Sequence, residues 1–105
     1  PENIKHGWYK FYLYLNINYL SSGWSRNRII MELNSKGYPC FSGTCSELYL
    51  EKCFQKKELS LKERLPIAKE LGETSLMFLI DQTISTKKMI KYAEEVKKIL
   101  ILATK

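Results

Sequence analysis

The sequence has few of the residues that nucleophilic catalysis needs. It contains a single histidine, His6, and no serine or cysteine stands in a recognisable nucleophile elbow. Since a Ser–His or Cys–His pair needs a base beside its nucleophile, neither type of site has support here. We expect His6 to precede the first strand without a catalytic role.

Long apolar runs are also absent. The longest, residues 76–80 and 99–103, fall far short of the roughly 20 residues that span a bilayer. No basic segment followed by an apolar stretch indicates a signal peptide, and the chain begins Pro1-Glu2-Asn3 without an initiator methionine. We expect a soluble, cytoplasmic protein without a membrane partner, and a longer chain of which these residues are a piece.

The three cysteines, Cys40, Cys45 and Cys53, have neither the spacing of a zinc site nor that of a compact disulfide framework. Reduced thiols and no metal are the expectation. A reactive Cys45, with a pKa lowered by a nearby helix start, is the alternative, although no histidine lies near it in the sequence.

The 105 residues suffice for one domain that buries about two-thirds of its unfolded surface. Hydrophobic residues make up 45% and charged residues 27%, which excludes a disordered chain. The net charge of +6 raises a nucleic-acid hypothesis. Because lysines mix with acids, as at residues 56–58, 62–64 and 94–98, the pattern favours solvated helix faces over a dedicated nucleic-acid surface.

Residues 8–20 alternate with a period of two, which predicts one long strand. Its apolar face, expected to meet the core, carries Tyr9, Phe11, Leu13, Leu15, Ile17 and Tyr19. The other face is aromatic and polar and includes Trp8, Tyr12 and Tyr14. Two interpretations of that face stay open: an exposed antiparallel surface, or a surface that a second domain or a ligand covers.

The middle of the chain shows two helix signals. Ser25 caps a helix that Gly37 ends, and a short strand is expected at residues 38–42. Thr44 and Glu47 then have the spacing of a capping box, which predicts a helix over residues 45–54.

Two features near this second helix have plain and functional interpretations. Glu47 and Glu51 lie one turn apart, but the cap and solvent explain them better than acid–base chemistry does. Ser42-Gly43-Thr44, ahead of a helix start, is a candidate anion site, with a simple helix cap as the alternative. Residues 55–63 are predicted to form a loop.

Residues 66–80 contain a joint between two elements. Pro66 fits the first turn of a short helix, and Gly72 fits the C′ position at its end. The turn Glu73-Thr74-Ser75 lacks the Gly-Lys-Ser/Thr ending of a phosphate loop, so we interpret it as a joint. The apolar run that follows predicts a strand with both faces covered, or a central strand.

The last helix is capped by Ser85 and has one apolar stripe for docking on the sheet, made of Met89, Ala93, Val96, Leu100 and Ala103. The order of elements predicts an α+β domain with helices mostly on one face of a sheet. Such layers serve many functions, so the pattern alone names no activity.

Four stretches resemble the C-terminal part of the DegT/DnrJ/StrS-type sugar aminotransferases, which are fold-type-I enzymes dependent on pyridoxal phosphate. They read HGWYKFY (residues 6–12), GWSRNRII (residues 23–30), KGYPCFSGTCSELYLEKCF (residues 36–54) and, most distinctively, RLPIAKELGETSLMFLI (residues 64–80). Together they cover nearly the whole chain in the family's order.

The resemblance implies that residues 1–105 are one domain, a small C-terminal domain with a three- or four-stranded, mainly antiparallel sheet. It would close on a large domain that holds pyridoxal phosphate on an internal lysine. That domain is not in this sequence, so no lysine here takes that role, and the fragment alone is expected to bind no cofactor and to be inactive.

The same resemblance implies a substrate and a place for it. Amino groups would pass from an amino acid, commonly glutamate, to a keto-sugar nucleotide used in cell-surface polysaccharide or glycan synthesis, in an enzyme that is usually a homodimer. Phe41, Ser42 and Cys45 would line the substrate cleft, with Tyr9 close by.

The sequence departs from the family's pattern at one visible position. After the third strand, related family members usually read His-Pro-Thr-Leu, whereas this chain has Asp81-Gln82-Thr83-Ile84. If that histidine has a substrate role, this chain has lost it. Either the parent protein is then inactive or that position is unimportant for activity. The alternative function is a non-catalytic regulatory or binding module that kept the small-domain fold.

Overall fold

The computed structural model describes residues 2–4, 7–55 and 63–105. His6, and all of the predicted loop except its two end residues, lie outside that part. The helices and strands are, in chain order, β1 (Lys10–Tyr14), α1 (Arg26–Ser35), β2 (Cys40–Phe41), α2 (Lys52–Gln55), α3 (Pro66–Thr74), β3 (Ser75–Leu79) and α4 (Thr86–Ala103).

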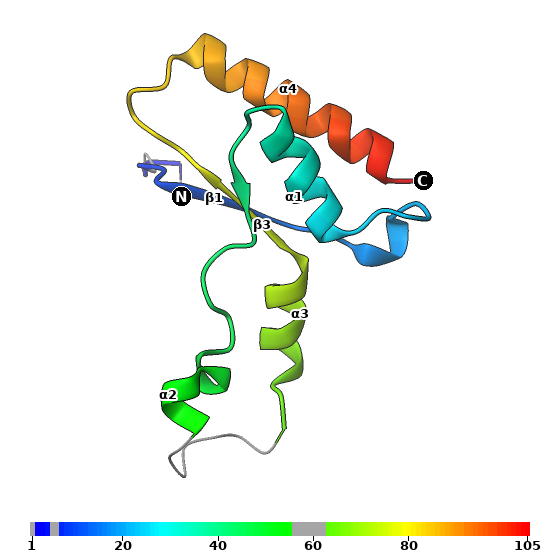
Figure 1. Cartoon of the computed structure of the whole chain (residues 1–105). Coiled ribbons are helices and arrows are strands. Elements are labelled where there is room, and N and C mark those ends of the chain that lie inside the picture. Colours follow the sequence, from blue (N-terminus) through cyan, green and yellow to red (C-terminus); the bar gives the residue numbers. More distant parts are fainter. Residues whose placement is uncertain (1, 5–6, 56–62) are drawn as a thin grey trace.

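The three strands form one antiparallel sheet in the order β1-β3-β2. Residues 75–78 of β3 are buried, as expected for a central strand. Figure 1 shows α1 and α4 side by side on one side of the sheet, whereas α2 and α3 project away from them. The predicted α+β class, with an antiparallel sheet and helices mostly on one face, is confirmed.

The core lies between the sheet and this helix pair. Ile29 and Leu33 of α1 and Leu76 of β3 are fully buried. The aromatic rings of Phe78 and Tyr92 meet edge to face, with centroids 5.9 Å apart, so that β3 contacts α4. The other buried members of the core are Cys40, Ile99 and Ala103.

Both predicted serine caps are confirmed. Ser25 Oγ accepts from Arg28 N at 3.2 Å, and Ser85 Oγ accepts from Lys88 N at 3.4 Å. Gly37 has a φ of +79°, as its position after α1 requires. These local signals therefore set where α1 and α4 begin and where α1 ends.

The predicted strand over residues 8–20 is too long. Pairing with β3 ends at Tyr14, and Asn16 Oδ1 accepts from Asn18 N to start a 3-10 turn at Ile17–Tyr19. Tyr9, Ile17 and Tyr19, which were predicted to face the core, are exposed. The alternating sequence pattern continues beyond the end of the pairing with β3. Without a partner strand, β1 ends there although the pattern does not.

The predicted helix over residues 45–54 is also wrong. A 3-10 turn at Leu48–Leu50 is followed by extended backbone at Glu51 and by the single turn of α2. Glu47 does not cap a helix, and its carboxylate pairs instead with Arg64. The bidentate ion pair satisfies Glu47 better than a capping box does, and it buries a residue that was predicted to face solvent.

The prediction for Gly72 is wrong as well. Helix α3 continues through it to Thr74, and β3 starts at the next residue. Gly72 has no positive φ. A Cβ placed on it would lie 2.0 Å from Ser46 Oγ, so the glycine is needed for the close approach of another segment.

Candidate functional site

The face of the sheet opposite α1 and α4 carries a row of side chains across all three strands. Tyr12 pairs with Met77, and Met77 pairs with Phe41. Leu76 and Phe78 point into the core, so alternation puts Met77 and its two partners on the other face. Met77 is only 7% exposed there, while Phe41 is 43% exposed. We call the row formed by Tyr12, Met77 and Phe41 the aromatic row.

The chain segment that follows β2 is held against the aromatic row. Gly43 has a φ of +97°, and a Cβ on it would lie 2.8 Å from the Tyr12 ring. Ser75 Oγ donates to the carbonyl oxygen of Ser42 at 2.5 Å. Residues 42 and 43 are therefore fixed by β1 and β3, although they are distant from both in the sequence.

Asn34 fixes the other side of β2. Its Nδ2 donates to the carbonyl oxygens of Ile30 and Cys40, each at 2.8 Å, and its Oδ1 accepts from Cys40 N at 3.2 Å. A strand of only two residues has few ladder hydrogen bonds of its own. The Asn34 amide supplies the missing edge partner and so positions Phe41 and Ser42.

A hollow of about 670 Å³ lies between α1 and residues 40–43. Arg26, at the start of α1, lines it together with Phe41, Ser42 and Gly43. One Arg26 terminal nitrogen donates to the Gly72 carbonyl oxygen at 3.1 Å, whereas its buried Nε finds no hydrogen-bond partner among the described residues. The hollow thus combines an aromatic ring, a backbone turn and a guanidinium group.

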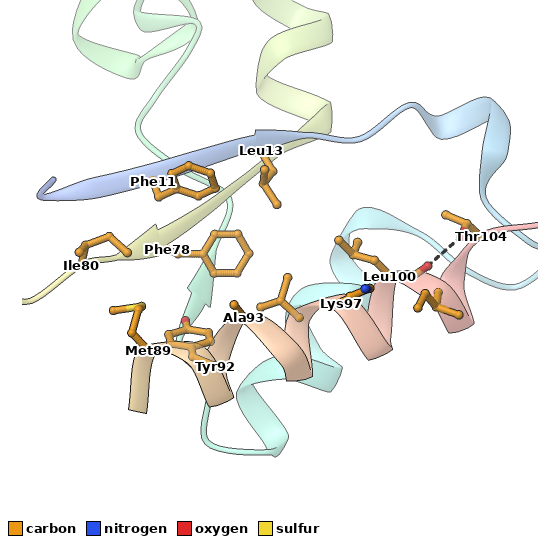
Figure 2. A pocket seen from close by; sticks show the side chains of 12 residues that line it. Phe11, Leu13, Phe78, Ile80, Met89, Tyr92, Ala93, Lys97, Leu100 and Thr104 are labelled. Atoms are coloured by element: carbon orange, nitrogen blue, oxygen red, sulfur yellow. Dashed lines mark hydrogen bonds between the residues drawn. The ribbon is translucent and has the colours of Figure 1, made fainter. Parts of the chain in front are cut away.

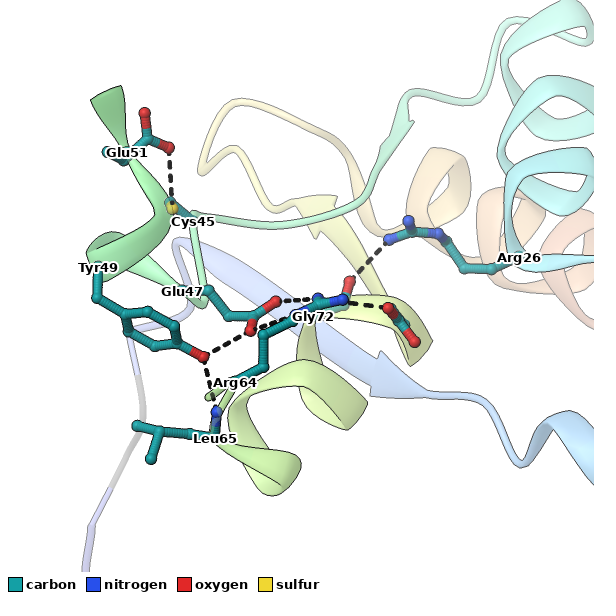
Figure 3. Close-up of polar contacts among 9 residues, drawn as sticks. Arg26, Cys45, Glu47, Tyr49, Glu51, Arg64, Leu65 and Gly72 are labelled. Atoms are coloured by element: carbon teal, nitrogen blue, oxygen red, sulfur yellow. Dashed lines mark hydrogen bonds and ion pairs between the residues drawn. The ribbon is translucent and has the colours of Figure 1, made fainter. Parts of the chain in front are cut away.

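Figure 3 shows a second polar cluster, made of Glu47, Tyr49, Arg64 and Leu65, which ties residues 45–51 to the start of α3. Arg64 donates to both carboxylate oxygens of Glu47, from Nε at 2.9 Å and from a terminal nitrogen. The Tyr49 hydroxyl donates to Glu47 Oε1 at 2.6 Å and accepts from Leu65 N at 3.0 Å.

These contacts fix the charges of the cluster. Hydrogen bonding from Arg64, and then from Tyr49, lowers the pKa of Glu47 from its ordinary 4.5 to about 2. Burial and the Glu47 carboxylate raise the pKa of Tyr49. A carboxylate held this firmly in its charged form is an anchor for the chain and a poor proton donor near neutrality.

The structure brings together only some of the residues predicted for the cleft. Phe41 and Ser42 line the same hollow. Cys45 is exposed, and its thiol donates to Glu51 Oε1 at 3.3 Å. Tyr9 is 70% exposed and lines a separate hollow with Trp8 and residues 79–83.

The sequence did not predict three residues at the hollow and the aromatic row. These are Arg26, which lines the hollow, Tyr12, which contacts Gly43, and Ser75, which donates to Ser42. Only strand pairing brings Tyr12 and Ser75 to this loop, so no local motif marks them. Of the predicted aromatic face, Tyr12 is half-buried, while Trp8 and Tyr14 are 47% and 56% exposed.

Residues 81–84, where the sequence differs from the family that it resembles, form a tight turn. Asp81 Oδ1 accepts from Thr83 N at 2.7 Å and from Thr83 Oγ1 at 2.8 Å. These hydrogen bonds, backbone first, lower the pKa of Asp81. Asp81 therefore has a local role in shaping the chain before α4.

Within residues 2–4, 7–55 and 63–105, no group of three or more His, Cys, Asp or Glu side chains could hold a metal ion. No helix there is long and apolar enough to cross a membrane.

Comparison with solved structures gives a decisive match. An aminotransferase from Psychrobacter cryohalolentis superposes with a TM-score of 0.84 and 44% sequence identity over 90% of this chain. The chain is related to an aminotransferase. The match lies in the C-terminal part of that enzyme and spans 24% of its length.

Two other comparisons found nothing. No protein-family model matches the chain, and no curated protein matches it. The solved aminotransferase is therefore the finding on which the functional argument depends, and its C-terminal region has the same α+β arrangement as this chain.

Proposed function

We propose that this chain is the C-terminal domain of a pyridoxal-phosphate-dependent aminotransferase of the DegT/DnrJ/StrS type. The parent enzyme would transfer an amino group from an amino acid, commonly glutamate, to a keto-sugar nucleotide. The observation that carries the proposal is the 44% identity, over 90% of the chain, to a solved aminotransferase. The four resembling stretches, above all residues 64–80, supply the family and the substrate class.

In this proposal the chain forms one wall of the substrate cleft. The ring of Phe41 offers a flat apolar surface to a sugar or a base, and the fixed turn at Ser42 and Gly43 brings the backbone close to it. The Arg26 guanidinium lines the same hollow, and its positive charge suits the negative phosphates of a nucleotide sugar. Cys45 and Tyr9 would meet substrate only from its periphery.

The cofactor does not fit this chain alone. Pyridoxal phosphate needs a lysine amine, and the residues described around the Phe41 hollow include Arg26 but no lysine. We therefore assign the Schiff-base lysine to the large domain of the parent enzyme, and no chemical step to this chain. Its own contribution is to bind and orient the substrate and to exclude water.

The remaining parts of the proposal follow from the family. The first partner of this domain is its own large domain, and the parent enzyme is a cytoplasmic homodimer that serves cell-surface polysaccharide or glycan synthesis. The open aromatic face, with Trp8, Tyr12 and Tyr14, is surface that the large domain would partly cover.

Reduction with borohydride tests the assignment of the cofactor. The parent polypeptide is loaded with pyridoxal phosphate and reduced, and the pyridoxyl-lysine is located by peptide mass spectrometry. We expect the modified lysine outside residues 1–105, and no modification of the isolated chain. A pyridoxyl-lysine inside these residues would refute the assignment, and a parent that takes up no cofactor would favour the regulatory or binding module.

A further inference from the structure

Ser75, the first residue of β3, has a buried side chain on the face of the sheet that carries the aromatic row. In Figure 2, Phe78 points from β3 toward Tyr92 on α4. Because side chains alternate along a strand, Ser75 lies on the opposite face of β3 from Phe78. Only 6% of Ser75 is exposed. Its hydroxyl group therefore serves a contact within the protein.

That contact takes the place of a strand hydrogen bond. Phe41 pairs with Met77. The same register, continued by two residues, would bring Gly43 opposite Ser75. The strand β2 ends at Phe41, however, and Gly43 has a φ of +97°, which is outside the β region. Ser75 Oγ reaches across and donates to the Ser42 carbonyl oxygen at 2.5 Å. The side chain thus holds this segment to β3 where the backbone ladder has ended.

Tyr12 confines the same turn from the side of the sheet. A Cβ at Gly43 would lie 2.8 Å from the Tyr12 ring and 3.4 Å from Ser75 Oγ. The ring therefore blocks movement of the turn toward the sheet, and the hydrogen bond from Ser75 opposes movement away from it. Together the two contacts fix the position of the backbone at residues 42 and 43.

This turn forms one side of the hollow between α1 and residues 40–43. Ser42 and Gly43 line the hollow with Phe41 and Arg26. A shift of the turn would change its separation from the guanidinium group that the proposed function assigns to the phosphates. A ligand that contacts both groups binds only while the turn is in place. Its apparent dissociation constant therefore rises as the ordered fraction of the turn falls.

We propose that Ser75 is a positioning residue for the substrate, because its hydrogen bond holds the turn at Ser42 and Gly43 where the hollow accepts a nucleotide sugar. Ser75 acts through the turn and contacts no substrate itself. The inference rests on the proposed function, since it needs a nucleotide sugar in the hollow. The Schiff-base lysine belongs to the large domain, so loss of the Ser75 hydroxyl group should raise KM and leave kcat unchanged.

Three variants isolate the hydroxyl group. Ser75→Ala removes it, and Ser75→Thr keeps it as the conservative change. Thr74→Val is the matched control, because Thr74 is the adjacent buried residue and its hydroxyl donates to the Glu70 carbonyl oxygen at 2.7 Å, within α3. Ser75→Ala and Thr74→Val each lose one hydroxyl group and one hydrogen bond to a carbonyl oxygen, but only the first change touches the turn.

Backbone order in the 105-residue chain gives the first test. We expect ¹⁵N order parameters of about 0.85 at Gly43 and Thr44, as in a rigid backbone, and values below about 0.6 in Ser75→Ala. Ser75→Thr and Thr74→Val should keep the rigid values. A turn that stays equally rigid in Ser75→Ala would overturn the proposal.

Steady-state kinetics of the parent polypeptide give the second test, with the keto-sugar nucleotide that it aminates. Loss of one hydrogen bond predicts a KM raised about two- to tenfold in Ser75→Ala, with kcat unchanged. Ser75→Thr and Thr74→Val should keep the KM of the unaltered enzyme. An unchanged KM in Ser75→Ala, or an equal rise in Thr74→Val, would contradict the positioning role.

The two tests separate this inference from the proposed function. A parent that aminates a nucleotide sugar with the same KM before and after Ser75→Ala refutes only the inference. A parent that aminates no keto-sugar nucleotide refutes the proposed function, and it refutes the inference as well, even if Ser75→Ala loosens the turn.

Discussion

Ser46 packs directly on the backbone of Gly72. A Cβ at Gly72 would lie 2.0 Å from Ser46 Oγ and 3.1 Å from Ser46 Cβ. The Gly72 carbonyl oxygen also accepts from Arg26 at 3.1 Å, so this one residue of α3 touches both α1 and the segment after β2. The sequence position that resembles a helix end is instead where three segments meet.

Replacing Gly72 by alanine should therefore destabilise the domain. In an exposed helix the change would add about 1 kcal/mol of stability, but here the added methyl group overlaps Ser46. We expect a net loss of about 1–3 kcal/mol in the free energy of unfolding, measured by urea denaturation.

The double variant Ser46→Gly/Gly72→Ala provides the control. Because Ser46→Gly removes both clashing atoms, it should restore most of the lost stability, and the coupling energy should be well above the scatter of additive changes. A Gly72→Ala protein as stable as the unaltered chain would show that Ser46 simply rotates away.

Glu47→Gln tests the anchor between residues 45–51 and α3. The folded pKa of Glu47 is about 2, below its ordinary 4.5. Its ion pair with Arg64 therefore contributes full stability above pH 4.5, and the contribution is lost as the pH falls from 4.5 toward 2. We expect the variant to be less stable at pH 7 and to converge with the unaltered chain near pH 2.

Thermal unfolding across this pH range makes the measurement, with Glu94→Gln, an exposed position on α4, as the matched control. A Glu47→Gln protein whose deficit is the same at every pH would mean that the carboxylate contributes through packing and not through its charge.

Asn34→Ala tests how the short strand β2 is held. The change removes three hydrogen bonds to Ile30 and Cys40, and it should cost about 1–2 kcal/mol, since these groups are only partly buried. The Cys40 amide should lose protection from hydrogen exchange. Asn34→Asp, which keeps the Oδ1 acceptor, should preserve part of that protection; equal loss in both variants would assign the effect to α1 instead.

The three thiols should differ sharply in reactivity. Burial raises the pKa of Cys40 to about 11, and its side chain is 1% exposed, whereas Cys45 and Cys53 are exposed. At pH 8 we expect an aromatic disulfide reagent to modify Cys45 and Cys53 quickly and Cys40 only on unfolding. Rapid modification of all three thiols in the folded chain would contradict the position of β2.

Short sequence motifs correctly predicted the helix ends that depend only on neighbouring residues. Ser25, Ser85 and Gly37 act through neighbours a few residues away, and each does what its position predicts. Alternation likewise included the residues of β1, and the apolar run after Ser75 indicated the central position of β3. These are features that a single stretch of sequence contains in full.

The failures have a common physical cause. The predicted capping box of Glu47 does not form, because Arg64, 17 positions away, donates two hydrogen bonds to the carboxylate. Position 72 must be glycine because Ser46 approaches it closely, and the turn at Ser42 is held by a hydrogen bond from Ser75. Each of these contacts involves a partner that is distant in the sequence, and local propensity carries no information about such a partner. The residues that surround the candidate cleft were missed for the same reason.

We propose that the parent polypeptide aminates a keto-sugar nucleotide. The most direct measurement is mass spectrometry of the nucleotide sugar after incubation of the purified parent with pyridoxal phosphate, glutamate and a keto-sugar nucleotide. The account predicts replacement of the oxo group by an amino group, with an equal amount of 2-oxoglutarate formed. Cofactor-loaded parent that leaves a panel of such sugars unchanged, but transaminates between amino and keto acids, would contradict it.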